Sequence, residues 1–287
     1  MATLSLDQLV ACVKELPPLP ATAVRLMEMT SSPTTSVRDI GDLIGSDVAM
    51  TTRVLKIANS AYYGMPRSVQ TVREAVLILG MKAVRNLAIA AAASDTLQMD
   101  SSGYGMNQGA LWKHSLNTAM LSQMVASRTR VAPADEAFVA GLLHDVGKVV
   151  LSVYVSAQFE AIEALVELDG IQFAEAERRV LGFDHAEVGA KVAERWNLPE
   201  ALCQAVGGHH APFASEEDRP LAVVVHLANV LAGDQRFGHQ IPYPTALDPA
   251  VGERLSLTAQ DREDLIVEAA ENAAKAGALF EIGARAA

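Results

Sequence analysis

Apolar residues recur at the spacing of an α-helix along most of the chain, whereas the alternation that is typical of strands is nearly absent. Several of these stretches begin at a side chain that can cap a helix, namely Ser36, Ser46 or Asp47, and Thr71. In the first part of the chain the pattern predicts helices over residues 21–29, 36–45, 47–59, 71–80 and 81–97. Residues 87–93 are apolar throughout, and we expect them to lie inside the protein.

The polar segment 100–105 contains two Gly residues and predicts a boundary between two halves. Beyond it, the pattern predicts helices near residues 108–128, 134–155, 157–168, 172–181, 184–196, 199–206, 219–233 and 259–280. Segment 234–257 is rich in Gly and Pro and is predicted to be a loop. Trp196 ends a helix with an apolar face, so we expect its side chain to be largely buried. The sequence thus predicts an all-α protein of two packed helical halves, residues 1–107 and 108–287, with a C-terminal helical tail.

Composition and charge exclude several classes of protein. Half of the residues are apolar and 20% are charged, which is typical of a globular chain with a sizeable core. The net charge of −11 and the lack of a basic patch oppose binding to nucleic acid, so no such partner is expected. The longest apolar run has seven residues, far fewer than the ~20 that span a bilayer. Cys12 and Cys203 lie far apart without a CxxC pattern, and the amino terminus lacks a secretory signal, so we expect a cytoplasmic protein with reduced thiols.

The residues that could carry chemistry are histidines, all seven of which lie in the second half. The sharpest pattern is His144-Asp145, an imidazole beside a carboxylate in an apolar stretch. Because unpaired buried polar groups are costly, we expect this pair and the other clustered histidines to converge on one polar pocket. The predicted set is His114, His144, Asp145, His185, His209 and His210. Neutral imidazole and ionised carboxylate suit a divalent transition metal such as Fe, Ni, Mn or Zn.

A structural role is the alternative for each histidine, since a buried imidazole is often satisfied by a backbone carbonyl. His226 and His239 have no comparable neighbours in the sequence and are predicted to be structural. Nothing in the spacing decides between a metal cluster and a polar cluster without a ligand.

Several segments together resemble the HDOD domain, which belongs to the HD superfamily of helical metal-dependent phosphohydrolases. The resemblance covers roughly residues 12–235. It is carried by the segments LPPLP (16–20), IGSD (44–47), ANSAYYG (58–64), the helix from EAV to LG (74–80), GLLHDVGK (141–148), DHAEVG (184–189), WNLP (196–199) and GHH (208–210). The occurrence of the ANSAYYG and HD segments in this order makes the resemblance specific, and it implies an HD-like helical bundle in the second half.

The resemblance also implies a ligand set. Enzymes of the superfamily bind one or two metals through a first His, the His-Asp pair, later His residues and a late Asp. By position, His114 matches the first His, His144-Asp145 the pair, and His185 with the doublet His209-His210 the later histidines. The late Asp falls on Asn229, whose amide offers only a neutral oxygen, so weak or partial metal occupancy is expected.

Members of the HDOD family are generally regarded as signalling modules. The cyclic-di-GMP phosphodiesterase branch carries Gly-Tyr-Pro after its His doublet, and here Ala211-Pro212-Phe213 follows instead. We therefore expect a regulator that acts through contacts with a signalling protein, without catalysis and without catalytic residues; a homodimer is compatible with the sequence. A metal-dependent phosphohydrolase with Asp145 as ligand and base is the alternative, and a DNA-linked regulator is disfavoured by the charge.

Two further features allow two interpretations each. Lys148 lies four residues after His144 and shares its helix face. We favour the interpretation that Lys148 lies at the rim and caps a helix over the interpretation that it holds a phosphate.

The segment 59–63 contains Asn59-Ser60 and Tyr62-Tyr63. We interpret it first as a helix C-cap and turn, and second as a docking surface between the halves or for a partner.

Overall fold

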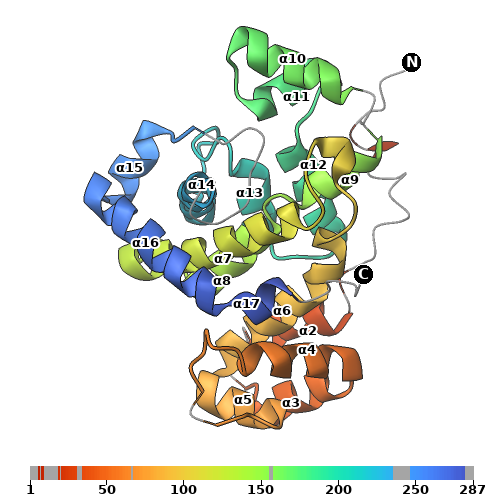
Figure 1. Cartoon of the computed structure of the whole chain (residues 1–287), viewed down its shortest axis with the longest axis vertical. Helices are drawn as coiled ribbons and strands as arrows, with labels where there is room; N and C mark the ends of the chain where they lie inside the picture. Colours follow the sequence, from red (N-terminus) through yellow and green to blue (C-terminus); the bar gives the residue numbers. More distant parts are fainter. Residues whose placement is uncertain are drawn as a thin grey trace.

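The computed structural model describes residues 6, 8–9, 19, 21–30, 34–65, 67–154, 158–234 and 246–281. Throughout this part the chain forms helices joined by turns and contains no strand, which confirms the all-α prediction (Figure 1). Cys12, His239 and residues 235–245 of the predicted loop lie outside the described residues.

The first helices pack around one central helix. They are α2 (Ala21–Thr30), α3 (Val37–Gly45), α4 (Val48–Ala58) and α5 (Val72–Leu79), and the central helix is α6 (Met81–Leu97). Three predicted caps are confirmed: the side chains of Ser36, Asp47 and Thr71 each accept a hydrogen bond from the backbone N–H three residues later. These bonds satisfy N–H groups that the first turn of a helix leaves without partners.

The later helices form a bundle above this layer (Figure 1). Its members are α7 (Ala110–Thr129), α8 (Ala134–Leu143), α9 (Val146–Tyr154), α12 (His185–Arg195), α13 (Glu200–Gly208) and α14 (Pro220–Ala232). The helices α10 (Phe159–Asp169) and α11 (Phe173–Leu181) form a hairpin on the side away from the first helices (Figure 1).

The α6 helix also packs against α7, α8 and α9, so one hydrophobic core runs through both layers. All seven residues of the segment 87–93 are buried, as predicted. Trp196 is 6% exposed, which confirms its predicted burial. The division of the chain at residue 107 stays a prediction.

The prediction of one helix over residues 134–155 is wrong. The chain breaks at His144 and Asp145, which form a turn between α8 and α9. Successive residues of a continuous helix point about 100° apart. At this turn the two side chains lie together, with His144 Nε2 3.3 Å from Asp145 Oδ2.

The last part of the predicted loop 234–257 is also helical. The helix α15 (Pro249–Leu255) begins after Asp248, whose carboxylate accepts a hydrogen bond from Ala250 N at 2.9 Å. The Asp-Pro start is a helix signal that the composition of the segment concealed. The predicted helix 259–280 is two helices, α16 (Ala259–Lys275) and α17 (Gly277–Phe280).

The C-terminal helices connect the two layers. The α16 helix packs on α7 and α14, while α17 contacts both α7 and α4. The indole N–H of Trp112 donates to the carbonyl of Phe280 at 3.2 Å. At the end of α4, Asn59 is the C-cap, and its side chain exchanges hydrogen bonds with the backbone of Val69 at 2.7 and 2.9 Å. This agrees with the first interpretation of that segment.

The predicted boundary loop is partly ordered as a short 3₁₀ helix, η1 (Ser102–Tyr104). Tyr104 is only 3% exposed, and η1 packs against α9 of the bundle. No helix of the described residues is long and apolar enough to cross a membrane.

Candidate metal centre

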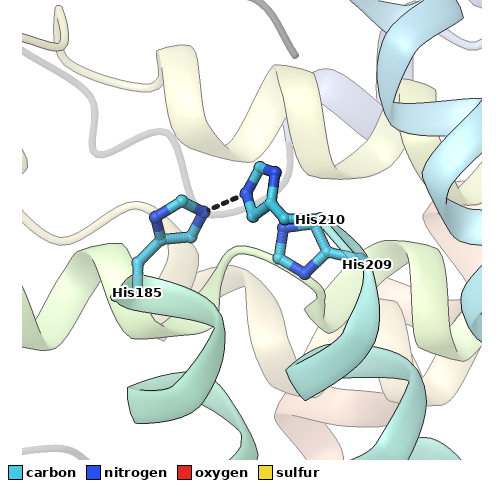
Figure 2. Close-up of side chains that lie close together, drawn as sticks. All are labelled: His185, His209 and His210. Carbon is cyan, nitrogen blue, oxygen red and sulfur yellow. Dashed lines mark hydrogen bonds between the residues drawn. The ribbon is translucent and has the colours of Figure 1, made fainter. Parts of the chain in front are cut away.

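Four places in the bundle contribute the predicted residues. His114 lies on α7, His144 and Asp145 form the turn between α8 and α9, His185 begins α12, and His209 and His210 follow α13. Figure 2 shows the ring of His185 facing the doublet His209-His210. Five of the six are at most 1% exposed, and His210 is partly buried. The structure therefore brings all six residues into one buried polar cluster.

Two glycines of the GLLHDVGK segment allow the helices to approach this closely. A Cβ on Gly147 would lie 1.9 Å from the carbonyl oxygen of His185, and a Cβ on Gly141 would lie 2.8 Å from the carbonyl oxygen of Thr118. Since both neighbours are backbone atoms, only glycine fits at these crossings. The crossings place the His144-Asp145 turn between α7 and α12.

Asp145 is the centre of the cluster. Its Oδ2 lies 2.7 Å from Lys148 Nζ, 3.3 Å from His144 Nε2 and 3.5 Å from His114 Nε2. Its Oδ1 lies 3.3 Å from His185 Nε2 and 3.7 Å from His209 Nε2. Burial opposes ionisation of Asp145, yet the adjacent His144 imidazole and the Lys148 ammonium outweigh it and hold the pKa of this carboxyl well below its usual range.

The interpretation of Lys148 as a lysine at the rim is wrong. Its side chain is buried, its ammonium pairs with Asp145, and it lies 5.9 Å from the centre of the Tyr104 ring. An ammonium in this position already neutralises part of the carboxylate charge. The lysine is therefore part of the cluster.

Backbone carbonyls orient two of the imidazoles. His144 Nδ1 lies 2.8 Å from the carbonyl of Gly141, and His209 Nδ1 lies 2.7 Å from that of Val206. With Nδ1–H donating to a carbonyl, Nε2 is left as an acceptor facing Asp145. Burial, reinforced by neighbouring imidazoles, lowers the pKa of His209 and His210 well below the usual value, so both are neutral as metal ligands must be.

Asn229 lies in the cluster, on α14. Its Oδ1 accepts a hydrogen bond from His114 Nε2 at 2.9 Å. The Asn229 amide thus lies beside His114, at the position where the family resemblance implies an Asp ligand. His226 is structural, as predicted: it bonds the carbonyl of His209 at 2.8 Å and accepts a bond from Asp248 N at 3.0 Å.

Sequence reasoning missed two members of the cluster, Glu177 and Tyr104. The buried carboxylate of Glu177 lies 2.5 Å from His185 Nδ1 and also accepts a hydrogen bond from the Tyr104 hydroxyl. Although burial lowers the pKa of His185, the Glu177 charge outweighs it and raises that pKa to about 9. One signal was available: Glu177 lies on the apolar face of α11 with Ala174 and Leu181.

The donor atoms fit a divalent transition metal. Among the described residues, His144 Nε2, Asp145 Oδ1 and His209 Nε2 are buried and have no hydrogen-bond partner, and such atoms are rare in proteins. Two groups of donors each lie within 4.8 Å of one another: His114, His144 and Asp145, and then His185, His209 and His210. Nitrogen and carboxylate donors in this number are suited to Fe, Ni, Mn or Zn.

Residues 16–212 match the family model of the HDOD domain. The chain belongs to the HDOD family. Crystal structures of family-like proteins share its fold over nearly the whole chain. An HDOD domain protein of unknown function from Geobacter sulfurreducens has a TM-score of 0.78 and 26% identity, with 97% of each chain covered.

Two further solved structures carry different functional names. A candidate phosphohydrolase from Shewanella amazonensis SB2B has a TM-score of 0.74 and 26% identity, covering 96% of this chain and 97% of its own. A candidate signal transduction protein from Marinobacter aquaeolei VT8 has the same TM-score and identity, covering 95% of this chain and 60% of its own.

A curated relative is longer than this HDOD protein. The chain is 31% identical over 229 residues to an uncharacterised protein of Treponema pallidum (strain Nichols), and the match covers 76% of this chain. The chain spans only 42% of that relative's length.

Proposed function

We propose that this HDOD protein is a cytoplasmic signal-transduction module that acts through contacts with a signalling protein and does not catalyse a reaction. The observation that carries the proposal is Asn229, whose neutral amide lies 2.9 Å from His114 Nε2. A metallophosphohydrolase needs enough ligand charge to hold its metal and an open position for substrate. At this position the cluster has an amide where the enzyme branch that the chain resembles has a carboxylate.

Two other features support the proposal. Lys148 already pairs with Asp145, the carboxylate shared by most of the histidines. His114, His144, Asp145 and His209 are each 0% exposed, whereas a phosphoester needs direct contact with the metal and its water.

The cluster is also our proposed site for a divalent transition metal, at weak or partial occupancy. His114, His144 and Asp145 would hold it on one side, and His185, His209 and His210 on the other. A bound metal would act as a Lewis acid and would join residues of α7, α12, α13 and the α8–α9 turn. Its contribution in a signalling module is to stabilise one arrangement of these elements.

A metal-dependent phosphohydrolase is the second candidate. It is favoured by the orphaned donor atoms of His144, Asp145 and His209 and by the name of the Shewanella structure. In that case Asp145 would serve as ligand and base.

A turnover assay separates the two candidates. The wild-type protein is loaded with Mn²⁺, Fe²⁺, Ni²⁺ or Zn²⁺ and assayed on cyclic and linear nucleotide phosphoesters. We expect no turnover above that of the His144→Ala and Asp145→Ala variants. Turnover in the wild type that disappears in both variants would overturn the signalling proposal in favour of the enzyme.

A further inference from the structure

The Nδ1 edge of His185 is held by a carboxylate, unlike the Nδ1 edges of His144 and His209. Glu177 Oε2 lies 2.5 Å from His185 Nδ1 and accepts a second bond from the backbone N–H of the same residue at 3.2 Å. The Tyr104 hydroxyl donates to the other oxygen, Oε1. Both carboxylate oxygens are thereby engaged, and Glu177 is 0% exposed.

The opposite edge of the same ring faces the proposed metal ligands. His185 Nε2 lies 2.7 Å from His210 Nε2 and 3.3 Å from Asp145 Oδ1 (Figure 2). In the neutral ring that a metal requires, Nδ1–H donates to Glu177 and the Nε2 lone pair is directed into the group His185, His209 and His210. The carboxylate thus sets both the tautomer and the direction of the ring.

A carboxylate has a different effect from a carbonyl in this position. A carboxylate that accepts the second N–H of a metal-bound imidazole increases the basicity of that ligand and fixes its orientation. Removing such a partner typically lowers metal affinity by about 10- to 100-fold. Burying the Glu177 carboxylate is costly, and its bonds to His185 and Tyr104 offset that cost.

We propose that Glu177 is the positioning residue of the cluster, orienting His185 so that its Nε2 binds a divalent transition metal together with His209 and His210. The inference rests on the metal site proposed above. Tyr104 holds the second carboxylate oxygen and so fixes Glu177 in turn. Glu177 lies on α11, so the orientation of His185 depends on the position of the α10–α11 hairpin. This hairpin lies at the edge of the bundle (Figure 1).

Glu177→Gln tests the proposal, with Zn²⁺ as the probe in isothermal titration calorimetry on the full chain. The amide keeps the shape of the side chain but removes the charge, and we expect Zn²⁺ affinity to fall by at least about 10-fold. Glu175→Gln is the matched control: it makes the same change on the same helix, at a side chain that is 44% exposed and pairs with Arg179. Its Zn²⁺ affinity should equal that of the wild type.

The His185→Ala background separates positioning from a merely structural role. If Glu177 acts through the imidazole, adding Glu177→Gln to His185→Ala should cause no further loss of Zn²⁺ affinity. A structural bond between α11 and α12 would instead lower the affinity in both backgrounds by the same factor, and this result would overturn the proposal.

Nitrogen-15 NMR of the metal-free protein provides an independent readout. We expect the His185 ring to carry a proton on Nδ1 in a strong hydrogen bond, and this resonance to move in Glu177→Gln but not in Glu175→Gln. An Nδ1 without a proton in the wild type would overturn the role of Glu177. A wild-type protein that binds no Zn²⁺ would overturn the proposed metal site itself, whereas Zn²⁺ binding that is unchanged in Glu177→Gln would overturn only the inference about Glu177.

Discussion

Asn229 is the residue that sets the charge available to a metal beside His114. Its amide oxygen is a neutral donor, and Asp145 shares its own charge with Lys148. Asn229→Asp adds a carboxylate where the enzyme branch of the superfamily has one, and we expect the metal content of the purified protein to rise. Elemental analysis of both proteins, prepared in the same way, measures the change.

Asn197→Asp is the control for this substitution, because it adds the same charge on the exposed surface at the opposite end of α12 from His185. Its metal content should match that of the wild type. An equal metal content in Asn229→Asp and the wild type would show that the correspondence with the enzyme branch does not hold at this position.

The close crossing of α9 and α12 brings the His144-Asp145 turn next to His185. Gly147 lies where a Cβ would meet the His185 carbonyl at 1.9 Å and the Gly189 nitrogen at 2.7 Å. Because backbone atoms cannot rotate away, we expect Gly147→Ala to lower the free energy of unfolding by about 3 kcal/mol or more, as overpacked cores do. Urea denaturation followed by circular dichroism measures the loss.

Gly45→Ala is the matched control at the end of α3, where an added Cβ would meet nothing within 4 Å. Replacing Gly by Ala in a helix reduces the entropy of the unfolded chain, so this variant should be as stable as the wild type or up to ~1 kcal/mol more stable. Equal stability of both variants would mean that the two helices can separate at Gly147 without cost.

At the scale of the whole molecule, the ion pair of Arg85 on α6 with Asp135 on α8 links the first helices to the bundle. The two groups lie 2.8 Å apart, with side chains 6% and 14% exposed. Burial alone would raise the pKa of Asp135, but the Arg85 charge, with help from Lys82, lowers it. Asp135→Asn leaves the buried guanidinium without its charged partner and should cost about 3 kcal/mol at neutral pH.

The same pair predicts how this difference depends on pH. A carboxyl whose pKa is lower in the folded state contributes stability above its unfolded pKa, and the contribution is lost as the pH falls through the folded pKa. The stability difference between wild type and Asp135→Asn should therefore shrink below the ordinary Asp pKa of 3.8. Denaturation at pH 7 and pH 3 measures this stability difference.

Glu194→Gln is the control, because it breaks an exposed ion pair with Lys191. It should lower the free energy of unfolding by less than ~1 kcal/mol at both pH values.

The sequence by itself determined most of the helices and the chemistry-bearing residue types. Caps at Ser36 and Thr71 depend on groups three positions apart, and the burial of residues 87–93 follows from an apolar run within one helix. These interactions are local, so one sequence is enough to predict them. The histidines and Asp145 could be named for the same reason, because their chemistry does not depend on the fold.

Only the tertiary structure decided which groups face Asp145. The local pattern places Lys148 on a helix face, but its burial comes from packing of α9 against Tyr104. Glu177 and Tyr104 are 73 residues apart in the sequence and meet because the α10–α11 hairpin and η1 close on the start of α12. The break at residues 144–145 lies between two helix crossings, at Gly141 and Gly147, that the local sequence pattern does not reveal. Contacts between distant segments depend on how helices pack, and a helical period carries no information about the partner that covers its face.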